Sequence, residues 1–392
     1  MGLAACITSG RVSLLPSTHT REVISQLKAF AQDAACLTDE HDCAIDLPRI
    51  RYPTERAPAR VLPFEVPQID AAQLVAYVFT SGSTGAPVPY RKSFGPLAAC
   101  VHEAARRLGL AGDTWSIMAT VPPQHMYGLE SSVLMGLVTG HALCAERPFY
   151  PADIATALAA VPRPRALIST PVHLRALVSL GTLLPPLDLV VSATAPLAQQ
   201  LALEVEQRFD TRVLEVYGST ETGQIATRRP TACAEWQLWP GVTLTPRDAD
   251  TWAEGGHIEQ PTRMCDVLEL VGGDRFLLHG RQADLVNIAG KRSSLAYLNH
   301  QLNCIAGVLD GAFFHLDDGR GSQTGVARVA ACVVAPQMDA ARLGEALRER
   351  IDPVFLPRPL LFVARLPRNS TGKLPQEALM ALAAAHLKSS VA

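Results

Sequence analysis

The sequence predicts an α/β protein with a large N-terminal domain of parallel or mixed sheets flanked by helices and a small α+β C-terminal domain. Two observations predict this class. Short apolar stretches typical of buried strands alternate with amphipathic helical stretches between residues 97 and 216. Glycine-rich and hydroxyl-rich segments follow directly on several of these strands, at the positions where α/β proteins gather their ligand-binding residues.

Composition narrows the class further. A chain of 392 residues with 48% hydrophobic and 18% charged residues has room for two or three packed domains. A net charge of −2 and no run of five basic residues argue against a nucleic-acid surface. No stretch of 18 residues is uninterruptedly apolar, so we expect no membrane insertion. No basic segment precedes the early Arg11, so we expect no signal peptide. The expected location is cytoplasmic.

The nine cysteines are scattered and include no C-x-x-C pair, so we interpret them as reduced thiols rather than as a disulfide framework or a zinc site. Cys36, His41 and Cys43 form one near-cluster. A zinc site needs four well-spaced ligands, so the cluster favours no metal role.

The N-terminal elements lead up to the first glycine-rich loop. Residues 24–35 have helical spacing of apolar side chains, and threonines at 18–20 are placed to cap that helix. Five prolines between residues 46 and 69 predict an extended segment. The apolar run 74–79 then predicts a buried strand.

The remaining elements alternate. Helices are expected at 97–110, 129–139, 152–160, 171–180 and up to 209, with strands at 114–121, 142–145, 166–169, 187–192 and 212–216. This order favours a largely parallel sheet covered on both faces. A small antiparallel subdomain is expected at 228–256. Beyond it, strands at 285–288, 311–316 and 327–334 and helices at 295–305, 340–350 and the C-terminus predict a compact α+β unit.

The loop after strand 74–79 consists of small residues: Thr80, Ser81, Gly82, Ser83, Thr84 and Gly85. Glycine lets backbone N–H groups approach a ligand closely, and hydroxyls add donors, so the loop is suited to phosphate. It matches neither the P-loop nor the dinucleotide-binding pattern. The alternative is an ordinary loop of turn-forming residues.

Two further segments follow predicted strands. His125 comes directly after a strand that ends in two prolines, and is either a wall of a small-molecule pocket or an ordinary core or surface histidine. The segment Ser192, Ala193, Thr194 and Ala195 is small enough for the ring of a ligand to lie against its backbone.

The segment Tyr217, Gly218, Ser219, Thr220 and Glu221 has the groups that a nucleotide needs. Its ring can stack on a base, its hydroxyls can donate to phosphate, and its carboxylate can bind Mg²⁺. The alternative is a turn with an exposed acid.

Asp266 and Arg281 have side chains suited to the hydroxyls of a ribose, although each is equally compatible with a surface position. Lys373 lies in a polar loop before the last helix, where it is either solvated or able to reach a carboxylate once two domains close.

Taken in order, these motifs resemble those of the AMP-forming adenylate ligases, which include acyl- and aryl-CoA synthetases and the adenylation domains that load carrier proteins. The resemblance covers almost the whole chain through TSGSTG at 80–85, the His125 loop, SATAPL at 192–197, YGSTE at 217–221, Asp266 with GRQAD at 280–284, NIAGKR at 287–292 and STGK at 370–373. Each motif is weak alone, whereas the ordered set is specific.

The resemblance implies a role for each motif. Loop 80–85 would hold the ATP phosphates, Tyr217 would stack near adenine, Thr220 would bind phosphate and Glu221 would bind Mg²⁺. Asp266 and Arg281 would bind the ribose. Lys373 would bridge ATP and the carboxylate of a small acid during formation of the acyl-AMP. Gly290 and Arg292 would line the path of the phosphopantetheine thiol that then accepts the acyl group.

It also implies a division of the chain. Residues 1–280 would form a shortened N-terminal adenylation domain, 281–284 a hinge, and 285–392 a mobile C-terminal domain that carries Lys373.

The part before loop 80–85 and the segment between Glu221 and Asp266 are both short for the family, so the chain resembles a trimmed member. Two positions also depart from the family pattern. Val88 stands where a lysine usually follows the proline of the loop, so that Lys92 would have to substitute, and Ala283 stands at the usual hinge position. The compact form is similar to ligases of aryl-polyene and xanthomonadin-type pigment pathways, which charge an acyl carrier protein with a hydroxybenzoate-like acid.

Three alternatives stay open. One is a medium-chain fatty acyl- or aryl-CoA synthetase that uses free CoA. The second is a non-catalytic nucleotide-binding module, which Val88 and Ala283 favour and which Lys373, Glu221 and Asp266 oppose. A phosphotransferase has least support, because no P-loop lysine or paired metal-binding acids accompany the loop.

Overall fold

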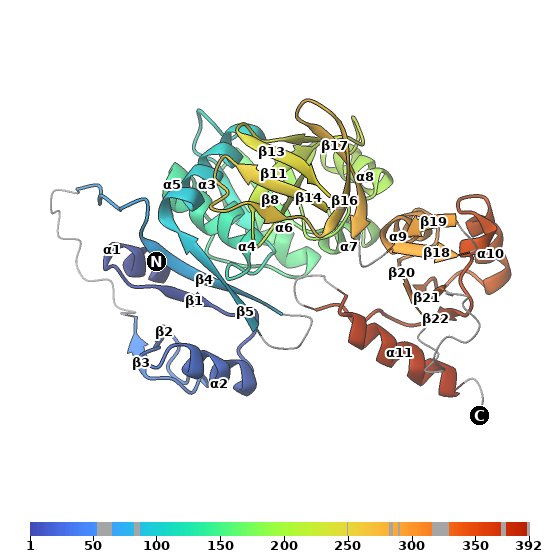
Figure 1. Ribbon diagram of the computed structural model, residues 1–392, viewed down its shortest axis with the longest axis horizontal. Helices are drawn as coiled ribbons and strands as arrows, with labels where there is room; N and C mark the ends of the chain where they lie inside the picture. The colour runs from blue at the N-terminus through green and yellow to red at the C-terminus, as the bar shows by residue number, and fades with distance from the viewer. Residues whose placement is uncertain are drawn as a thin grey trace.

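The computed structural model describes residues 1–52, 65–81, 87–248, 250–281, 285–288, 291–315, 329–369 and 374–389. Figure 1 shows a large sheet covered by helices, with the first elements of the chain on one side of it and the C-terminal elements on the other. The predicted α/β class is confirmed.

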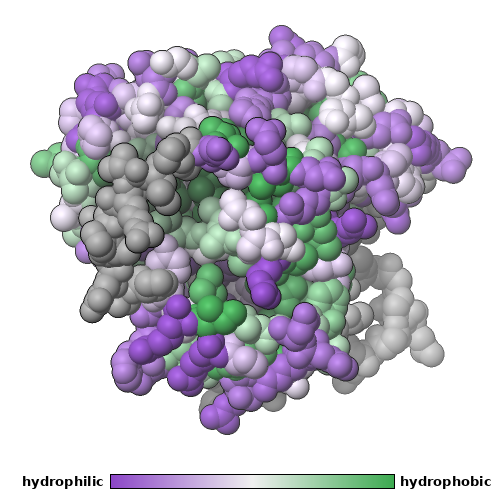
Figure 2. Space-filling view, turned by 90° about the vertical axis from the view of Figure 1, so that its left-hand side faces the viewer, coloured by the Kyte–Doolittle hydropathy of each residue, from purple (hydrophilic) through white to green (hydrophobic). Residues whose placement is uncertain are grey.

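The N-terminal elements form two small sheets. They are α1 (Gly2–Thr8), β1 (Ser13–Leu15), α2 (Arg21–Phe30), β2 (Cys36–Thr38), β3 (Arg49–Arg51), β4 (Leu74–Ser81) and β5 (Pro87–Ser93). Strand β4 lies between β1, which is parallel to it, and β5, which is antiparallel. Figure 2 shows this side of the molecule, where apolar side chains gather in a hollowed central area bordered by hydrophilic ones.

Helix α2 begins at Arg21, three residues before the predicted range 24–35, and it follows the predicted threonine cap; it also ends earlier than predicted. Thr20 caps it by accepting a hydrogen bond from the Val23 N–H at 3.4 Å. The helix ends at Phe30 rather than at residue 35, because the Phe30 ring packs edge-on against Tyr77 and Phe79 of β4, with centroid distances of 5.0 and 5.5 Å. The chain then turns into β2.

The large sheet has nine strands in the described residues, in the order β16-β17-β12-β11-β10-β9-β8-β6-β7. Their bounds are β6 (Ser116–Ala119), β7 (Ala142–Leu143), β8 (Arg165–Ser169), β9 (Leu189–Ser192), β10 (Arg212–Ser219), β11 (Gly223–Arg228), β12 (Trp236–Leu238), β16 (Asp266–Gly272) and β17 (Arg275–Arg281). The half from β7 to β10 is parallel and the other half is antiparallel. The sheet is therefore mixed rather than largely parallel.

Helices cover both faces of the parallel half. They are α3 (Phe94–Leu108), α4 (Met126–Gly128), the π-helix η1 (Leu129–Leu134), α5 (Met135–Thr139), α6 (Pro151–Ala159), α7 (Pro171–Ser179) and α8 (Gln199–Phe209). Side chains of β8 and β9 alternate between the two layers: Ile168 and Val191 pack with α3 and η1, whereas Leu167 and Val190 pack with α6, α7 and α8. Burial on both faces explains the near-continuous apolar sequence of these strands.

The predicted subdomain 228–256 is wrong in extent. Strand β12, which falls inside it, belongs to the large sheet, where Trp236 pairs with Phe276 of β17. The separate antiparallel sheet consists of β13 (Val242–Arg247), β14 (Asp250–Gly255) and β15 (Thr262–Arg263). Pairing between strands far apart in sequence is not visible in local patterns.

The C-terminal elements have a hydrophobic core of their own. They are β18 (Leu285–Ile288), β19 (Lys291–Ser294), α9 (Leu295–Asn303), β20 (Asp310–His315), β21 (Val329–Val334), α10 (Ala340–Arg348), the 3₁₀ turn η3 (Pro353–Phe355), β22 (Leu360–Phe362) and α11 (Gln376–Ser389). Leu298, Leu302, Val333 and Leu343 are fully buried in that core. None of the described helices is both long and apolar enough to cross a bilayer.

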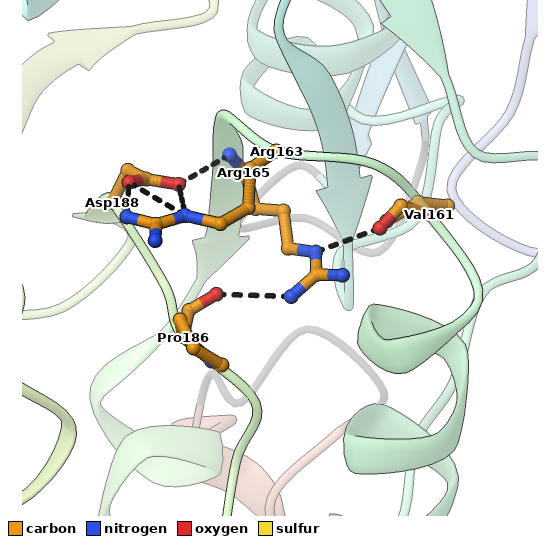
Figure 3. A network of polar contacts seen from close by, with 5 residues as sticks. All are labelled: Val161, Arg163, Arg165, Pro186 and Asp188. Carbon is orange, nitrogen blue, oxygen red and sulfur yellow. Dashed lines mark hydrogen bonds and ion pairs between the residues drawn. The ribbon is translucent and has the colours of Figure 1, made fainter.

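A polar network ties together the amino ends of β8 and β9 (Figure 3). Asp188, just before β9, pairs with the Arg163 guanidinium and accepts a hydrogen bond from the Arg165 N–H at 2.8 Å. The Arg165 side chain donates to the carbonyl oxygens of Val161 and Pro186 at 2.8 and 3.1 Å. Both loops at this end of the sheet are thereby anchored, and the carboxyl ends of the strands are left for the site.

Candidate active site

The segment 192–195 lies where the fold class predicts, at the carboxyl end of β9. Ser192 and Ala193 are buried, and Thr194 has a φ of 77°. A β-branched residue rarely adopts this left-handed conformation, so the surrounding packing imposes the path of the chain. Glu215 of β10 helps to hold that path, because its carboxylate accepts a hydrogen bond from the Leu197 N–H at 2.8 Å.

His125 is the residue that precedes a short helix, α4, which contacts the end of β9. It precedes α4, which begins at Met126, so the predicted helix 129–139 starts three residues early and includes the π-helix η1. Gly128 permits the tight approach, since a Cβ there would lie 2.1 Å from the Pro122 carbonyl oxygen. The Tyr127 hydroxyl donates to the Val191 carbonyl oxygen at 3.0 Å and so fixes α4 against the end of β9.

Residues 217–221 form a hairpin rather than a loop after a strand. Strand β10 continues past the predicted end at 216 to Ser219, because Gly218 and Ser219 pair with Gln224 and Gly223 of β11. Only glycine fits at 218, where a Cβ would lie 2.1 Å from the Gly223 carbonyl oxygen. Hydroxyl contacts between Ser219 and Thr222 at 3.2 Å hold the turn that presents Thr220 and Glu221.

The ribose-binding candidates meet this hairpin. The Tyr217 hydroxyl donates to the Asp266 carboxylate at 2.6 Å, and the Tyr217 ring packs against Trp236 and Phe276, each at 5.5 Å between centroids. Asp266 and Arg281 are cross-strand partners at the ends of β16 and β17. The structure therefore brings together residues that are 64 positions apart in the sequence, the distance from Tyr217 to Arg281.

Glu221 is held as a carboxylate. Partial desolvation raises its pKa, but hydrogen bonds, first that from the Tyr90 side chain, outweigh this effect and leave the pKa below its usual value. Burial and the Glu221 carboxylate together raise the pKa of Tyr90 to about 12. An exposed, ionised carboxylate is a suitable ligand for Mg²⁺ carried by phosphates. Within the described residues, no three His, Cys, Asp or Glu side chains are grouped to hold a metal ion.

Lys92 lies on β5 and is 7% exposed. Its ammonium donates to the main-chain oxygen of Glu221 at 3.3 Å, and burial lowers its pKa. It thus contacts the hairpin directly. Beside it, Ser93 donates from its N–H and hydroxyl to the Glu259 carboxylate at 3.1 and 2.9 Å.

Sequence analysis missed several polar residues behind this contact. Glu130 and Cys100 are each 1% exposed, and the Cys100 thiol donates to the Glu130 carboxylate at 3.2 Å. Gln224 of β11 and His257 lie in the same region. A usable signal was present for Glu130, since it is a charged residue within an otherwise apolar helical stretch.

Other expected site residues fall outside the described part of the chain. These are Gly82, Ser83, Thr84, Gly85, Gly290 and Lys373, together with hinge residues 282–284. Only the backbone is described for Ser81, Arg281 and Arg292. Thr80 is the last but one residue of β4, where it pairs with Val88 of β5. The near-cluster at the N-terminus is a thiol pair, with 3.8 Å between the Sγ atoms of Cys36 and Cys43, while His41 contacts Asp42.

Known proteins are similar to this chain in sequence. A family model described as AMP-binding enzyme matches residues 3–267. A 4-coumarate–CoA ligase of Rhodobacter capsulatus is 29% identical over 75% of this chain and 73% of its own, and one of Halorhodospira halophila is 27% identical over the same shares.

Solved structures share the fold. The o-succinylbenzoate CoA synthetase MenE of Bacillus subtilis, in complex with its acyl-adenylate intermediate, has a TM-score of 0.77 at 17% identity, covering 95% of this chain and 84% of its own. ATP-bound MatB of Rhodopseudomonas palustris has a TM-score of 0.74 at 18% identity, covering 97% and 91%. The family match spans most of the chain and includes the strand ends described above, and the chain therefore belongs to the AMP-binding enzymes, the AMP-forming ligases that activate carboxylic acids.

Proposed function

We propose that this ligase activates an aryl carboxylic acid, such as a hydroxybenzoate, to its acyl-AMP and transfers the acyl group to the phosphopantetheine thiol of an acyl carrier protein. The observation that carries the proposal is the contact of Tyr217 with Asp266 beside the Glu221 turn. This contact supports a single nucleotide site, in which the Tyr217 ring would stack near the base, Asp266 would bind the ribose and the turn would bind phosphate.

The chemistry assigned to these residues follows from their groups. A carboxylate oxygen of the acid attacks the α-phosphorus of ATP and pyrophosphate leaves, which requires that charge on the phosphoryl oxygens be stabilised. Thr220 and the loop 80–85 donate hydrogen bonds to phosphate, and Asp266 and Arg281 hold the ribose. Mg²⁺, with Glu221 as its protein ligand, would supply further positive charge at the phosphates.

The second half-reaction, transfer of the acyl group to the thiol, involves the C-terminal part of the chain. We assign residues 1–280 to the adenylation domain, 281–284 to the hinge and 285–392 to the C-terminal domain. Lys373 acts in acyl-AMP formation, and Gly290 and Arg292 line the thiol path once the C-terminal domain has rotated. Attack of the thiol on the acyl-AMP forms the thioester and releases AMP.

Support for an aryl acid comes from the relatives, two of which are named as 4-coumarate–CoA ligases. A benzoate CoA ligase of Burkholderia xenovorans also shares the fold, with a TM-score of 0.67 over 79% of this chain. The same names favour CoA as the acceptor and so make an aryl-CoA synthetase the second candidate. Carrier-protein transfer is favoured by the trimmed chain and its resemblance to carrier-charging ligases.

The test is ATP–pyrophosphate exchange with hydroxybenzoates, cinnamates and medium-chain fatty acids, followed by acyl transfer to CoA or to holo carrier protein. We expect exchange with aryl acids and transfer to the carrier. Exchange without transfer to the carrier, but with transfer to CoA, would establish the second candidate. No exchange with any acid, in a folded protein that binds ATP, would leave the non-catalytic nucleotide-binding module as the better account.

A matched pair of variants tests the ribose site. Asp266→Asn removes the charge that accepts from Tyr217 and should raise the KM for ATP about tenfold or more, since a hydrogen bond to a charged group contributes about 1.5–3 kcal/mol. Asp274 lies in the turn of the same β16–β17 hairpin, where it contacts Gln237. The control variant Asp274→Asn should therefore leave the KM for ATP unchanged. Equal effects of the two variants would contradict the assignment.

A further inference from the structure

A small polar cavity lies directly behind the Glu221 turn. Its volume is about 20 Å³, and it lies between β5, α3, η1, the β10–β11 turn and the segment after β14. The polar side chains that line it include Lys92, Cys100, Glu130, His257 and Glu259, which we call the Glu130 pocket. A cavity of this size accommodates one water-sized group.

Glu130 occupies an unusual position in this pocket. A fully buried carboxylate is expensive unless it is paired or hydrogen-bonded, and Glu130 is 1% exposed. Its hydrogen-bond donors are the Cys100 thiol, which is a weak donor, and Gln224 of β11. Its Oε1 atom lies against the hairpin, so that a Cβ at Gly223 would be 2.7 Å from it.

The pocket carries an excess of negative charge. The carboxylates of Glu221 and Glu259 outnumber the single ammonium of Lys92. Glu130 adds a third carboxyl group, which is partly ionised near neutral pH because burial raises its pKa to about 7. His257 adds no positive charge near neutral pH, because burial lowers its pKa to about 4. An environment with this balance favours a group that donates hydrogen bonds over one that only accepts them.

Two buried polar atoms near Glu130 have no hydrogen-bond partner among the described residues. One is Nε2 of His257, which lines the pocket, and the other is Oε1 of Gln224, whose Nε2 donates to Ser131, the neighbour of Glu130. Buried polar atoms are normally paired, and those that are not call for a ligand or an ordered water. The two atoms lie on different elements, β11 and the segment after β14, which face η1.

The backbone of η1 is itself unusual. Glu130 and Ser131 belong to a π-helix, a form that is rare and is frequent at functional sites. This turn continues directly from α4, which Tyr127 fixes against the end of β9 next to Ser192 and Ala193. Met126, the first residue of α4, lines the Glu130 pocket, so the pocket and the place where the proposed function puts the acid share this helix.

We propose that the Glu130 pocket receives a hydrogen-bond-donating substituent, a hydroxyl or an amino group, carried on the ring of the aryl acid, and that Glu130 is the specificity-determining residue. This inference rests on the proposed function and goes beyond it by naming the substituent that the site selects. The ring lies between α4 and segment 192–195, and its substituent donates to Glu130. Methyl, fluoro and methoxy substituents bring no donor to the carboxylate and displace water from the pocket, and a second carboxylate is repelled.

The experiment compares acids of matched shape in ATP–pyrophosphate exchange by the full chain. Benzoates and cinnamates that carry hydroxyl, amino, methyl or fluoro groups at the same ring position form the panel. We expect kcat/KM to be about 100-fold higher for the donor-bearing acids, because a buried group left unpaired is penalised more strongly than a change of one methylene. The ratio between donor and non-donor acids is the readout, since a general loss of stability lowers both.

Two variants complete the test. Glu130→Gln keeps the shape but removes the charge and should lower the donor preference about tenfold, because hydrogen bonds to charged groups are stronger than those between neutral groups. Glu103→Gln removes a carboxylate on α3 that pairs with Arg107 outside the pocket, and should leave the ratio unchanged.

The outcomes separate the two proposals. Exchange that is equally efficient with donor and non-donor acids in the wild-type chain overturns this inference while the proposed function stands, and this result does not depend on whether a variant folds. An unchanged ratio in folded Glu130→Gln also overturns it. Absence of exchange with every acid overturns the proposed function and this inference with it.

Discussion

Single residues set the chemistry of this site through their surroundings, and Glu130 is the clearest case. Burial, the largest cause, raises its pKa to about 7, although the Cys100 thiol and the Lys92 ammonium act in the opposite direction. Lys92 is affected as well, since burial lowers the pKa of its own ammonium. For both groups, burial makes the charged form less favourable, and this desolvation free energy has to be offset by the other interactions of the fold.

The pKa of Glu130 predicts how stability depends on pH. The carboxyl binds its proton more tightly in the folded chain than in the unfolded one, so its contribution is complete below about pH 4.5 and is lost as the pH rises through about 7. One pKa unit corresponds to about 1.4 kcal/mol, so the free energy of unfolding should fall by about 3 kcal/mol from this group. Glu130→Gln should lack this decrease.

Urea unfolding at about pH 5 and pH 8 measures this decrease in the free energy of unfolding. The difference between wild type and Glu130→Gln isolates Glu130, because His257 titrates in both proteins and cancels. Glu103→Gln should follow the wild type. A parallel pH dependence in wild type and Glu130→Gln would show that Glu130 is ionised over the whole range.

At the scale of elements, the two ends of the parallel strands have separate tasks. The amino ends of β8 and β9 are held by Asp188 and its arginine partners, while the carboxyl ends present His125, segment 192–195 and the hairpin. Stability and binding should therefore respond to different substitutions.

Asp188→Ala tests this separation. It removes the carboxylate that accepts from the Arg165 N–H and from Arg163, and should lower the free energy of unfolding by about 1–3 kcal/mol. The hydrogen bond from Arg163 lowers the pKa of Asp188, so this contribution is present above about pH 4 and is lost in acid.

The KM values for ATP and acid should not change in Asp188→Ala, and Asp33→Ala, at an exposed position on another part of the chain, should leave both stability and KM unaltered. A large rise in either KM for Asp188→Ala would mean that the amino ends of the strands also shape the site.

Local patterns predicted most single elements but not their partners. The spacing of apolar residues located α7, β8 and β9 to within about two residues, because burial on both faces leaves a strong signal. The extension of β10 to Ser219 and the membership of β12 in the large sheet depend on pairing with distant strands. The charge of Glu130 within an apolar helical stretch is a signal in the sequence, but the groups around it come from β5, α3 and β11 and are not visible in the local pattern.

At the scale of the whole molecule, the proposed mechanism divides the two half-reactions between two parts of the chain. The C-terminal elements have a core separate from that of the large sheet. The two parts meet beside the proposed hinge, where the Ser294 hydroxyl donates to the His279 carbonyl oxygen at 2.6 Å.

Lys373→Ala tests the division. It should reduce ATP–pyrophosphate exchange by a large factor, on the order of 100-fold or more, because the proposed mechanism assigns this lysine to charge neutralisation during acyl-AMP formation alone. ATP binding should persist, as should thioester formation from added acyl-AMP. The surface variant Lys28→Ala, at a lysine paired with Asp46, should resemble the wild type. Little effect of Lys373→Ala on exchange would favour a phosphotransferase.

The adjacent residues Lys92 and Ser93 on β5 have a consequence for dynamics. Lys92 contacts the hairpin of the large sheet, and Ser93 contacts Glu259, which lies between two strands of the sheet β13-β14-β15. Three sheets thus converge on the end of one short strand. Opening β5 would release all three at once, so its backbone amides should exchange with deuterium together with those of β11, and a nucleotide bound at the turn should slow the exchange of both.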